Sequence, residues 1–178
     1  MSNLAIIPAR GGSKRIPGKN IRDFLGKPII AYSIETALDS DLFDEVMVST
    51  DSEDIAIVSR EYGAKVPFMR SDKNADDHAT TAEVIAEVLN RYQNEGKKFE
   101  NACCIYPCAP LLQKQSLREA FSRLQKGFNS AFPVVAFGYP IQRALRTEGG
   151  KVSWRNPENA LIRSQDLETY YHDCGQFY

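Results

Sequence analysis

Short apolar runs along the chain alternate with stretches in which apolar residues recur every three or four positions. Runs of four to eight apolar residues bounded by turn residues are typical of strands buried on both faces. We therefore predict buried strands at residues 4–9, 46–50 and 102–106, another at residues 130–137, and a short strand at residues 65–69.

In the segments between these runs, apolar residues recur with the spacing of a helix. Pro28 suits the first turn of a helix that places Ile29, Ile30, Ile34 and Leu38 on one face. Thr80-Thr-Ala-Glu83 has the spacing of a capping box and predicts a helix from there to about Gln93. Two more helices are predicted, one from Ser52 to about Gly63 and one over residues 117–124.

This alternation predicts an α/β fold with a doubly wound, mainly parallel sheet that helices cover on both faces. Beyond Tyr139 the alternation stops, and residues 144–154 around Glu148-Gly-Gly150 predict a hairpin. A chain of 178 residues has the size of one domain. We expect residues 1–178 to form that domain, with residues 139–170 as a small hairpin-containing excursion.

Composition narrows the classes of partner. The 22 Lys and Arg nearly balance 23 Asp and Glu, so no global charge favours nucleic acid or an anionic membrane. The N-terminal apolar stretch is too short for a signal sequence or a spanning helix. Four cysteines, at 103, 104, 108 and 174, do not form the framework of a small secreted protein. We expect a cytoplasmic protein with reduced thiols.

The loop after the first predicted strand concentrates positive charge among glycines. Arg10, Lys14, Arg15 and Lys19 stand among Gly11, Gly12 and Gly18, at the sheet edge where doubly wound folds bind ligands. Glycines let the backbone approach a phosphate, and Arg and Lys neutralise its charge. On position alone, a solvated basic turn explains these charges equally well. The spacing matches neither the Walker loop nor the dinucleotide fingerprint.

The full run Ile7-Pro-Ala-Arg-Gly-Gly-Ser-Lys-Arg-Ile-Pro-Gly-Lys-Asn20 resembles the N-terminal motif of the CMP-sugar synthetases, the sialate and related nonulosonate cytidylyltransferases. The resemblance implies a nucleotide-diphospho-sugar transferase fold and CTP as a substrate. It implies that Arg10 and Lys19 are catalytic. The implied nucleotide-binding residues are Pro8, Ala9, Arg10, Gly11, Ser13, Lys14, Lys19, Asn20, Arg70 and Thr81.

Other segments of the family pattern have two interpretations each. Val48-Ser-Thr-Asp51 matches the second strand of the family, but Asp51 or the next residue can equally cap a helix. Asp76, Asp77 and His78 suggest a metal site, although such residues before a helix more often cap or solvate its N-terminus.

The sugar is indicated by a departure from the sialate pattern. Tyr106-Pro-Cys-Ala-Pro-Leu-Leu112 differs from the sialate synthetases and is similar to the branch of the family that acts on pseudaminic acid. This acidic nine-carbon sugar needs a cation and donors for its acylamino groups. The candidate sugar-binding residues are Tyr106, Gln142, Arg143, Arg163 and Tyr178, each of which can also be a surface residue. N-acetylneuraminate and legionaminate are the alternative sugars.

The resemblance also implies Mg²⁺ as cofactor and a homodimer in which residues 139–170 reach the partner's site. Family members continue beyond Gly175-Gln-Phe-Tyr178 and supply an Asp-x-Asp pair for the metal, so we expect those ligands in a segment absent from this chain. The chain is then a fragment of a longer enzyme or a catalytically silent CTP-binding module. Products of this family commonly decorate bacterial flagellins and surface polysaccharides.

Overall fold

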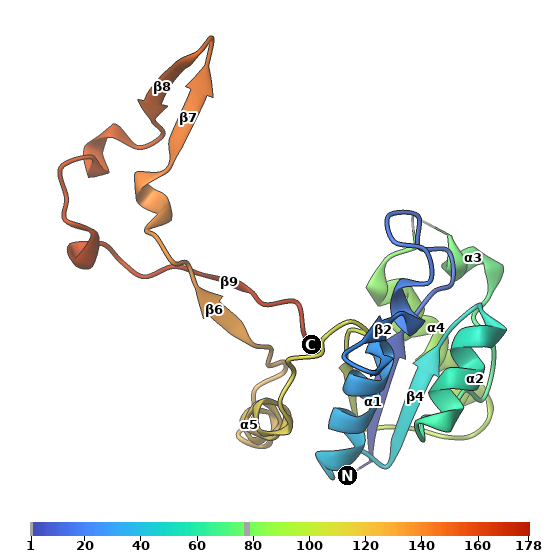
Figure 1. The fold of residues 1–178 in the computed structure, drawn as a ribbon. Helices are drawn as coiled ribbons and strands as arrows, with labels where there is room; N and C mark the ends of the chain where they lie inside the picture. Colours follow the sequence, from blue (N-terminus) through green and yellow to red (C-terminus); the bar gives the residue numbers. More distant parts are fainter. Residues whose placement is uncertain (1, 77–78) are drawn as a thin grey trace. The chain divides into compact units, whose positions relative to one another are not determined.

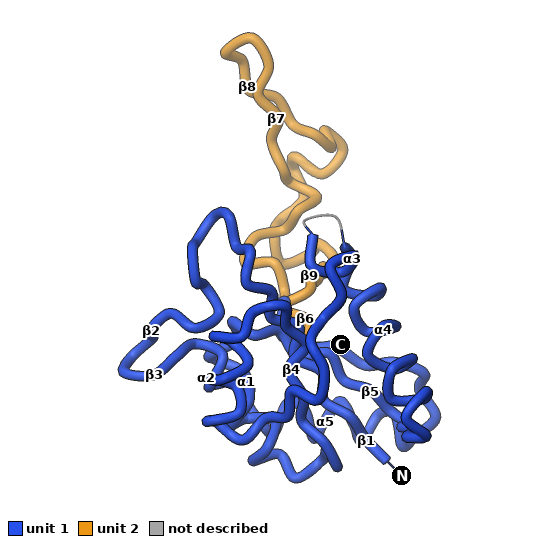
Figure 2. Tube along the Cα trace, turned by 90° about the vertical axis from the view of Figure 1, so that its right-hand side faces the viewer, with its two compact units in different colours: residues 1–132, 175–178 blue, residues 133–174 orange. Residues whose placement is uncertain are grey.

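The computed structural model describes residues 2–76 and 79–178, which divide into two units (Figure 2). Unit 1 comprises the described residues up to Phe132 together with Gly175–Tyr178. Unit 2 is Pro133–Cys174. No helix among the described residues is both long enough and apolar enough to cross a membrane.

Unit 1 is built on a sheet of three parallel strands (Figure 1). Strand β1 (Asn3–Pro8) lies between β4 (Glu45–Ser49) and β5 (Asn101–Cys104). Three of the predicted buried runs therefore form strands, with ends that differ by one or two residues. Because the strands are parallel, the loops that follow all three leave from one edge of the sheet.

Helices cover both faces of this sheet, as the alternation predicted. On one face lie α1 (Ile29–Asp39), α2 (Glu53–Glu61) and α5 (Lys114–Gln125), and on the other lies α4 (Thr81–Asn94). Successive residues of a strand point to opposite faces. Accordingly Ala5 and Ile7 join the first core cluster, whereas Leu4 and Ile6 pack with Val88 and Tyr92 of α4.

The predicted capping box begins α4. The Thr80 hydroxyl accepts a hydrogen bond from the Glu83 backbone N–H at 3.2 Å, and the Glu83 carboxylate accepts one from the Thr80 N–H at 2.8 Å. Two backbone donors that would otherwise be unpaired at the helix N-terminus are thus satisfied.

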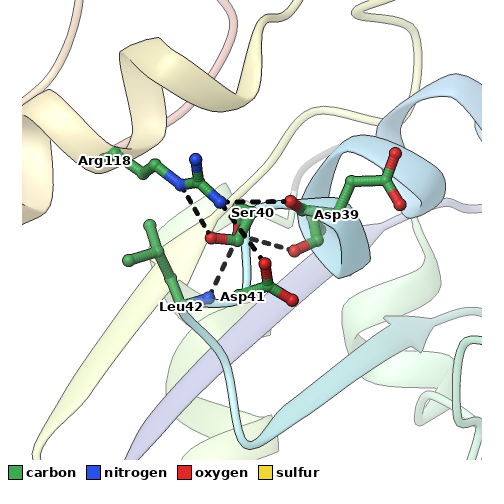
Figure 3. A network of polar contacts seen from close by, with 6 residues as sticks. Asp39, Ser40, Asp41, Leu42 and Arg118 are labelled. Atoms are coloured by element: carbon green, nitrogen blue, oxygen red, sulfur yellow. Dashed lines mark hydrogen bonds and ion pairs between the residues drawn. The ribbon is translucent and has the colours of Figure 1, made fainter.

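An arginine of α5 holds the end of α1 (Figure 3). Arg118 Nε donates to the Ser40 carbonyl at 3.0 Å, and Nη2 lies 3.4 Å from an Asp41 carboxylate oxygen. Asp41 has a φ of 55° as the chain turns out of the helix. A cation at the C-terminus of a helix donates hydrogen bonds to the last carbonyls and interacts favourably with the helix dipole.

The prediction of a strand at residues 65–69 is wrong. Lys65 alone makes a parallel bridge to Met47, donating to the Val46 carbonyl at 2.8 Å. Pro67 has no N–H to continue the pairing. Smaller elements that the pattern missed are β2 (Asp23–Phe24), β3 (Lys27–Pro28), α3 (Asp72–Ala75) and the 3-10 turn η1 (Lys19–Ile21).

Unit 2 consists of two antiparallel ladders and short turns. The predicted hairpin is confirmed as β7 (Leu145–Glu148) and β8 (Lys151–Trp154), joined by Gly149 and Gly150 with φ of 55° and 75°. The strand predicted at residues 130–137 is only β6 (Val134–Ala136), which pairs with β9 (Tyr171–Asp173). No residue of unit 2 is buried, although many are apolar.

Candidate functional site

A cavity of about 730 Å³ lies in unit 1 where the chain leaves β1 and β5. The loop after β1 forms one wall, the start of α4 another, and residues 106–108 a third. The lining residues are Pro8, Arg10, Ser13, Lys14, Arg15, Ile16, Lys19, Asn20, Arg70, Ala79, Thr81, Val84, Tyr106, Pro107, Cys108 and Gly175. This is the sheet edge at which the sequence predicted a ligand.

The cavity wall carries a strong positive charge. Five of its residues are cations, namely Arg10, Lys14, Arg15, Lys19 and Arg70, and no Asp or Glu occurs among the described residues that line it. Of the predicted nucleotide-binding residues, all except Ala9 and Gly11 line this cavity. Such a concentration of donors suits a polyphosphate, which needs its charge neutralised at several oxygens.

Uncharged or negative groups set the path of the basic loop. The Asp51 carboxylate accepts a hydrogen bond from the Gly11 N–H at 2.8 Å. Ser52 precedes α2 but its side chain makes no capping bond, so Asp51 ties the loop and neither residue caps the helix through its side chain. A Cβ on Gly11 would lie 2.9 Å from the Ser52 Cβ, which explains why a glycine stands there.

Asn20 joins two loops at the cavity. Its Nδ2 donates to the Arg10 carbonyl at 2.9 Å, and its Oδ1 accepts from the Cys108 thiol at 3.4 Å. Burial raises the pKa of Cys108, and the nearby charge of Lys19 opposes that rise. Sequence reasoning assigned the segment around Cys108 to sugar recognition and missed its contact with the basic loop, because the partner is 88 positions away.

Arg70 is a buried cation whose guanidinium is anchored at the end of β4. Its Nε donates to the Ser49 hydroxyl at 3.1 Å, and Nη2 donates to the Ser49 carbonyl. The residue as a whole is 8% exposed. Burial lowers the pKa of Arg70, while the carboxylates of Asp51 and Glu87 oppose this effect and Arg10 adds to it.

The segment before α4 contacts the basic loop. Arg10 Nη1 donates to the Asp76 carbonyl at 2.9 Å. The Asp76 carboxylate accepts from the Ala79 N–H at 2.7 Å, a local turn contact of the kind expected from the capping interpretation. Asp77 and His78, the other members of the suggested metal site, lie outside the described residues. Within residues 2–76 and 79–178, no three His, Cys, Asp or Glu side chains are grouped for a metal.

The predicted sugar-binding residues fall in both units. In unit 1, the Tyr106 and Tyr178 rings lie 5.4 Å apart because Gly175–Tyr178 returns antiparallel to residues 104–106. The Tyr178 N–H donates to the Cys104 carbonyl at 3.0 Å, and the Tyr106 N–H donates to the Gln176 carbonyl at 2.8 Å. Tyr106 lines the cavity described above.

Gln142, Arg143 and Arg163 belong to unit 2. The Arg143 guanidinium lies 5.9 Å from the Tyr139 ring centre and 5.5 Å from that of Trp154, and it donates to the Ser164 hydroxyl at 3.1 Å. Gln142 donates to the Glu168 carbonyl at 2.8 Å. Arg163 forms an ion pair with Asp166 at 2.7 Å. Their role in binding a sugar stays a prediction.

Comparisons with known proteins agree on one family. The model of the family described as Cytidylyltransferase matches residues 4–177. A pseudaminic acid cytidylyltransferase of Campylobacter jejuni is 47% identical over 180 aligned positions, which cover 100% of this chain and 78% of that protein. A CMP-N,N'-diacetyllegionaminic acid synthase of Legionella pneumophila is 42% identical over 120 positions, 67% of this chain and 52% of its own length.

The fold is also shared with a solved structure. A CMP:2-keto-3-deoxy-manno-octonic acid synthetase complexed with CTP matches with a TM-score of 0.70 and 21% identity, over 99% of this chain and 73% of that one. At this identity the likeness establishes the α/β nucleotidyltransferase fold alone.

Proposed function

The chain belongs to the cytidylyltransferase family, and from that premise we propose that it transfers CMP from CTP to pseudaminic acid and releases pyrophosphate. The observation that carries the proposal is the cavity with five cations, formed largely by the residues that the family motif implied. The 47% identity to a pseudaminic acid cytidylyltransferase supports that sugar over N-acetylneuraminate or legionaminate.

The proposed reaction is an in-line displacement. The anomeric hydroxyl oxygen of the sugar forms a bond to the α-phosphorus of CTP, the bond from that phosphorus to the bridging oxygen breaks, and pyrophosphate leaves with the electron pair. The hydroxyl proton passes to the surrounding water. Little covalent chemistry falls to the protein, so positioning and charge neutralisation carry most of the catalysis.

The residues divide the work by charge and position. Arg10 and Lys19 would neutralise the charge that develops on the leaving pyrophosphate, with Lys14 and Ser13 as further phosphate donors. Arg70 and Thr81 would contact the cytidine. Both lie well after the basic loop in the sequence, and both line the cavity. The neighbouring rings of Tyr106 and Tyr178 would contact the sugar in unit 1.

We propose Mg²⁺ as the cofactor, because the family typically uses it. The described residues do not fit such a site by themselves, since they hold no group of three potential ligands and no carboxylate in the cavity wall. We therefore assign no step of the reaction to the metal. Pyrophosphate release that persists unchanged in excess chelator would contradict the cofactor.

We propose a homodimer formed through unit 2. This unit has no buried residue of its own, and it exposes large apolar side chains such as Phe137, Leu145, Val152 and Leu161. Exposed apolar surface of this kind favours a covering partner, and a second copy of the chain is the simplest one. Sedimentation equilibrium should give twice the chain mass, and a monomer at all concentrations would refute the dimer.

The test of the proposed chemistry is removal of one cavity cation. Lys19→Ala should lower kcat for pyrophosphate release at least about a hundredfold, as expected for the loss of a charge that stabilises the transition state. Lys126→Ala is the matched control, because Lys126 is exposed at the end of α5 and does not line the cavity. Equal rates for the two variants would reject the assigned role.

A further inference from the structure

Glu87 of α4 is a part-buried carboxylate that accepts hydrogen bonds from the segment between Arg70 and α4. Its two oxygens accept from the Ser71 N–H at 2.9 Å, from the Ser71 hydroxyl at 2.9 Å, and from the Asn74 side-chain amide at 2.5 Å. Arg91, one helical turn further on, adds an ion pair at 3.1 Å. The Glu87 side chain is 13% exposed and lies outside the cavity wall.

These contacts fix the segment that directly follows Arg70. The Arg70 N–H donates to the Thr50 carbonyl at 2.8 Å, which ties residue 70 to the end of β4. Glu87 ties the next residue, Ser71, to α4. Asn74, in α3, is bonded to the same carboxylate and is itself buried. The backbone that carries Arg70 is therefore held from the sheet on one side and from α4 on the other.

The charge on Glu87 also matters. Burial raises the pKa of Glu87, but the hydrogen bonds from Asn74 and Ser71 and the charge of Arg91 outweigh burial, so the pKa lies below its ordinary value. The group is thus ionised at neutral pH and compensates the buried guanidinium of Arg70 electrostatically. Val84 and Thr81, which lie one and two helical turns before Glu87, line the cavity.

We propose that Glu87 is a positioning residue: it sets the orientation of Arg70 toward the cytidine and touches no substrate. This inference rests on the proposed function, because it takes CTP as the ligand of the cavity. A merely structural Glu87 would affect stability alone. A positioning Glu87 would affect the affinity for CTP, and it would do so through Arg70.

The experiment measures the Kd for CTP and the Kd for pyrophosphate by titration calorimetry on the full chain. Glu87→Gln keeps the size of the side chain, but its amide NH₂ then faces the donors of Ser71 or Asn74. Because these hydrogen bonds are lost, Arg70 loses its fixed position and CTP affinity should fall about tenfold. Pyrophosphate affinity should stay within about twofold, since the basic loop keeps its own anchors at Asp51 and Asn20. Ser71→Ala, which removes one donor and leaves α4 intact, should give a smaller loss in the same direction.

The matched control is Glu45→Gln. Glu45 is also a buried carboxylate bonded to α4, through Tyr92, but it lies at the opposite end of β4 from Ser49 and outside the cavity wall. Both variants should lower the melting temperature, whereas only Glu87→Gln should weaken CTP binding. An equal weakening by both would assign the effect to general destabilisation and overturn the proposal.

A double-mutant cycle tests whether Glu87 acts through Arg70. In an Arg70→Ala background, Glu87→Gln should cause no further loss of CTP affinity, because the group it positions is gone. Independent, multiplying losses would overturn the proposal, as would unchanged CTP affinity in Glu87→Gln and Ser71→Ala. Wild-type chain that binds CTP without releasing pyrophosphate would reject the proposed function and leave the role of Glu87 to be decided by these affinities. Wild-type chain that binds no CTP would overturn both.

Discussion

Single residues that carry no positive charge shape the basic loop. The Asp51 carboxylate accepts a hydrogen bond from the Gly11 N–H. The Asn20 side-chain amide donates to the Arg10 carbonyl and accepts from the Cys108 thiol. The sequence motif indicated which cations line the cavity, since charge and glycine spacing are local properties. It did not indicate the roles of Asp51 and Cys108, because their partners are chosen by the packing of strands that are far apart in sequence.

Gly11→Ala tests the close approach of the loop to α2. The added Cβ would lie 2.9 Å from the Ser52 Cβ, so the loop must shift away and CTP affinity should fall about tenfold. Ser52→Gly in the same chain removes the opposing Cβ and should restore most of the affinity, because the Ser52 side chain makes no capping bond. CTP titrations of the two variants decide the point, and an unrescued double variant would contradict the steric explanation.

At the scale of elements, local patterns predicted those that local physics determines. The β1, β4 and β5 runs, the four long helices and the β7–β8 hairpin follow from periodicity, capping and paired glycines. The two failures were apolar runs that the sheet does not accept. Pro67 ends the pairing that Lys65 begins. Residues 130–137 span the change from unit 1 to unit 2, and only Val134–Ala136 forms a strand, which pairs with β9 and not with the parallel sheet. β9 is too short and polar to be recognised from its sequence.

The cap of α4 makes a prediction about its own stability. Thr80→Ala removes the acceptor for the Glu83 N–H and should lower the free energy of unfolding by about 1 kcal/mol, whereas Thr80→Ser keeps the hydroxyl and should cost only a fraction of that. Urea unfolding followed by circular dichroism measures both variants. Equal stability of Thr80→Ala and wild type would show that the capping box does not stabilise the protein.

At the scale of the whole molecule, the two units differ in how they are stabilised. Unit 1 has two core clusters, one on each face of the sheet, whereas unit 2 has no buried residue. Sequence alternation therefore predicted the strands and long helices of unit 1 well, whereas the excursion predicted at residues 139–170 stays a prediction.

The pH dependence of stability should reflect Glu45, which joins β4, α4 and two lysines. Burial raises its pKa, but hydrogen bonds from Tyr92 and Lys65 and the charges of Lys65 and Lys97 prevail, so the pKa lies below its ordinary value. A carboxylate with a depressed folded-state pKa stabilises the protein above its unfolded pKa, and this stabilisation is lost as the pH falls through the folded pKa.

Wild type should therefore lose more stability than Glu45→Gln as the pH falls from about 5 through the folded-state pKa of Glu45. Urea unfolding of both proteins across this range provides the comparison. Parallel stability curves for the two would show that Glu45 is not linked to the acid sensitivity of the fold.

The central claim is transfer of CMP to pseudaminic acid in a cavity of unit 1. The most direct measurement is pyrophosphate release by this chain from CTP and Mg²⁺ with pseudaminic, N-acetylneuraminic or legionaminic acid in parallel. We predict that kcat/KM is at least about tenfold higher for pseudaminic acid, since a site that hydrogen-bonds specific substituents rejects analogues that place them differently. Faster turnover of another sugar would contradict the substrate, and CTP binding without release from any of the three would contradict CMP transfer by this chain and leave a nucleotide-binding module.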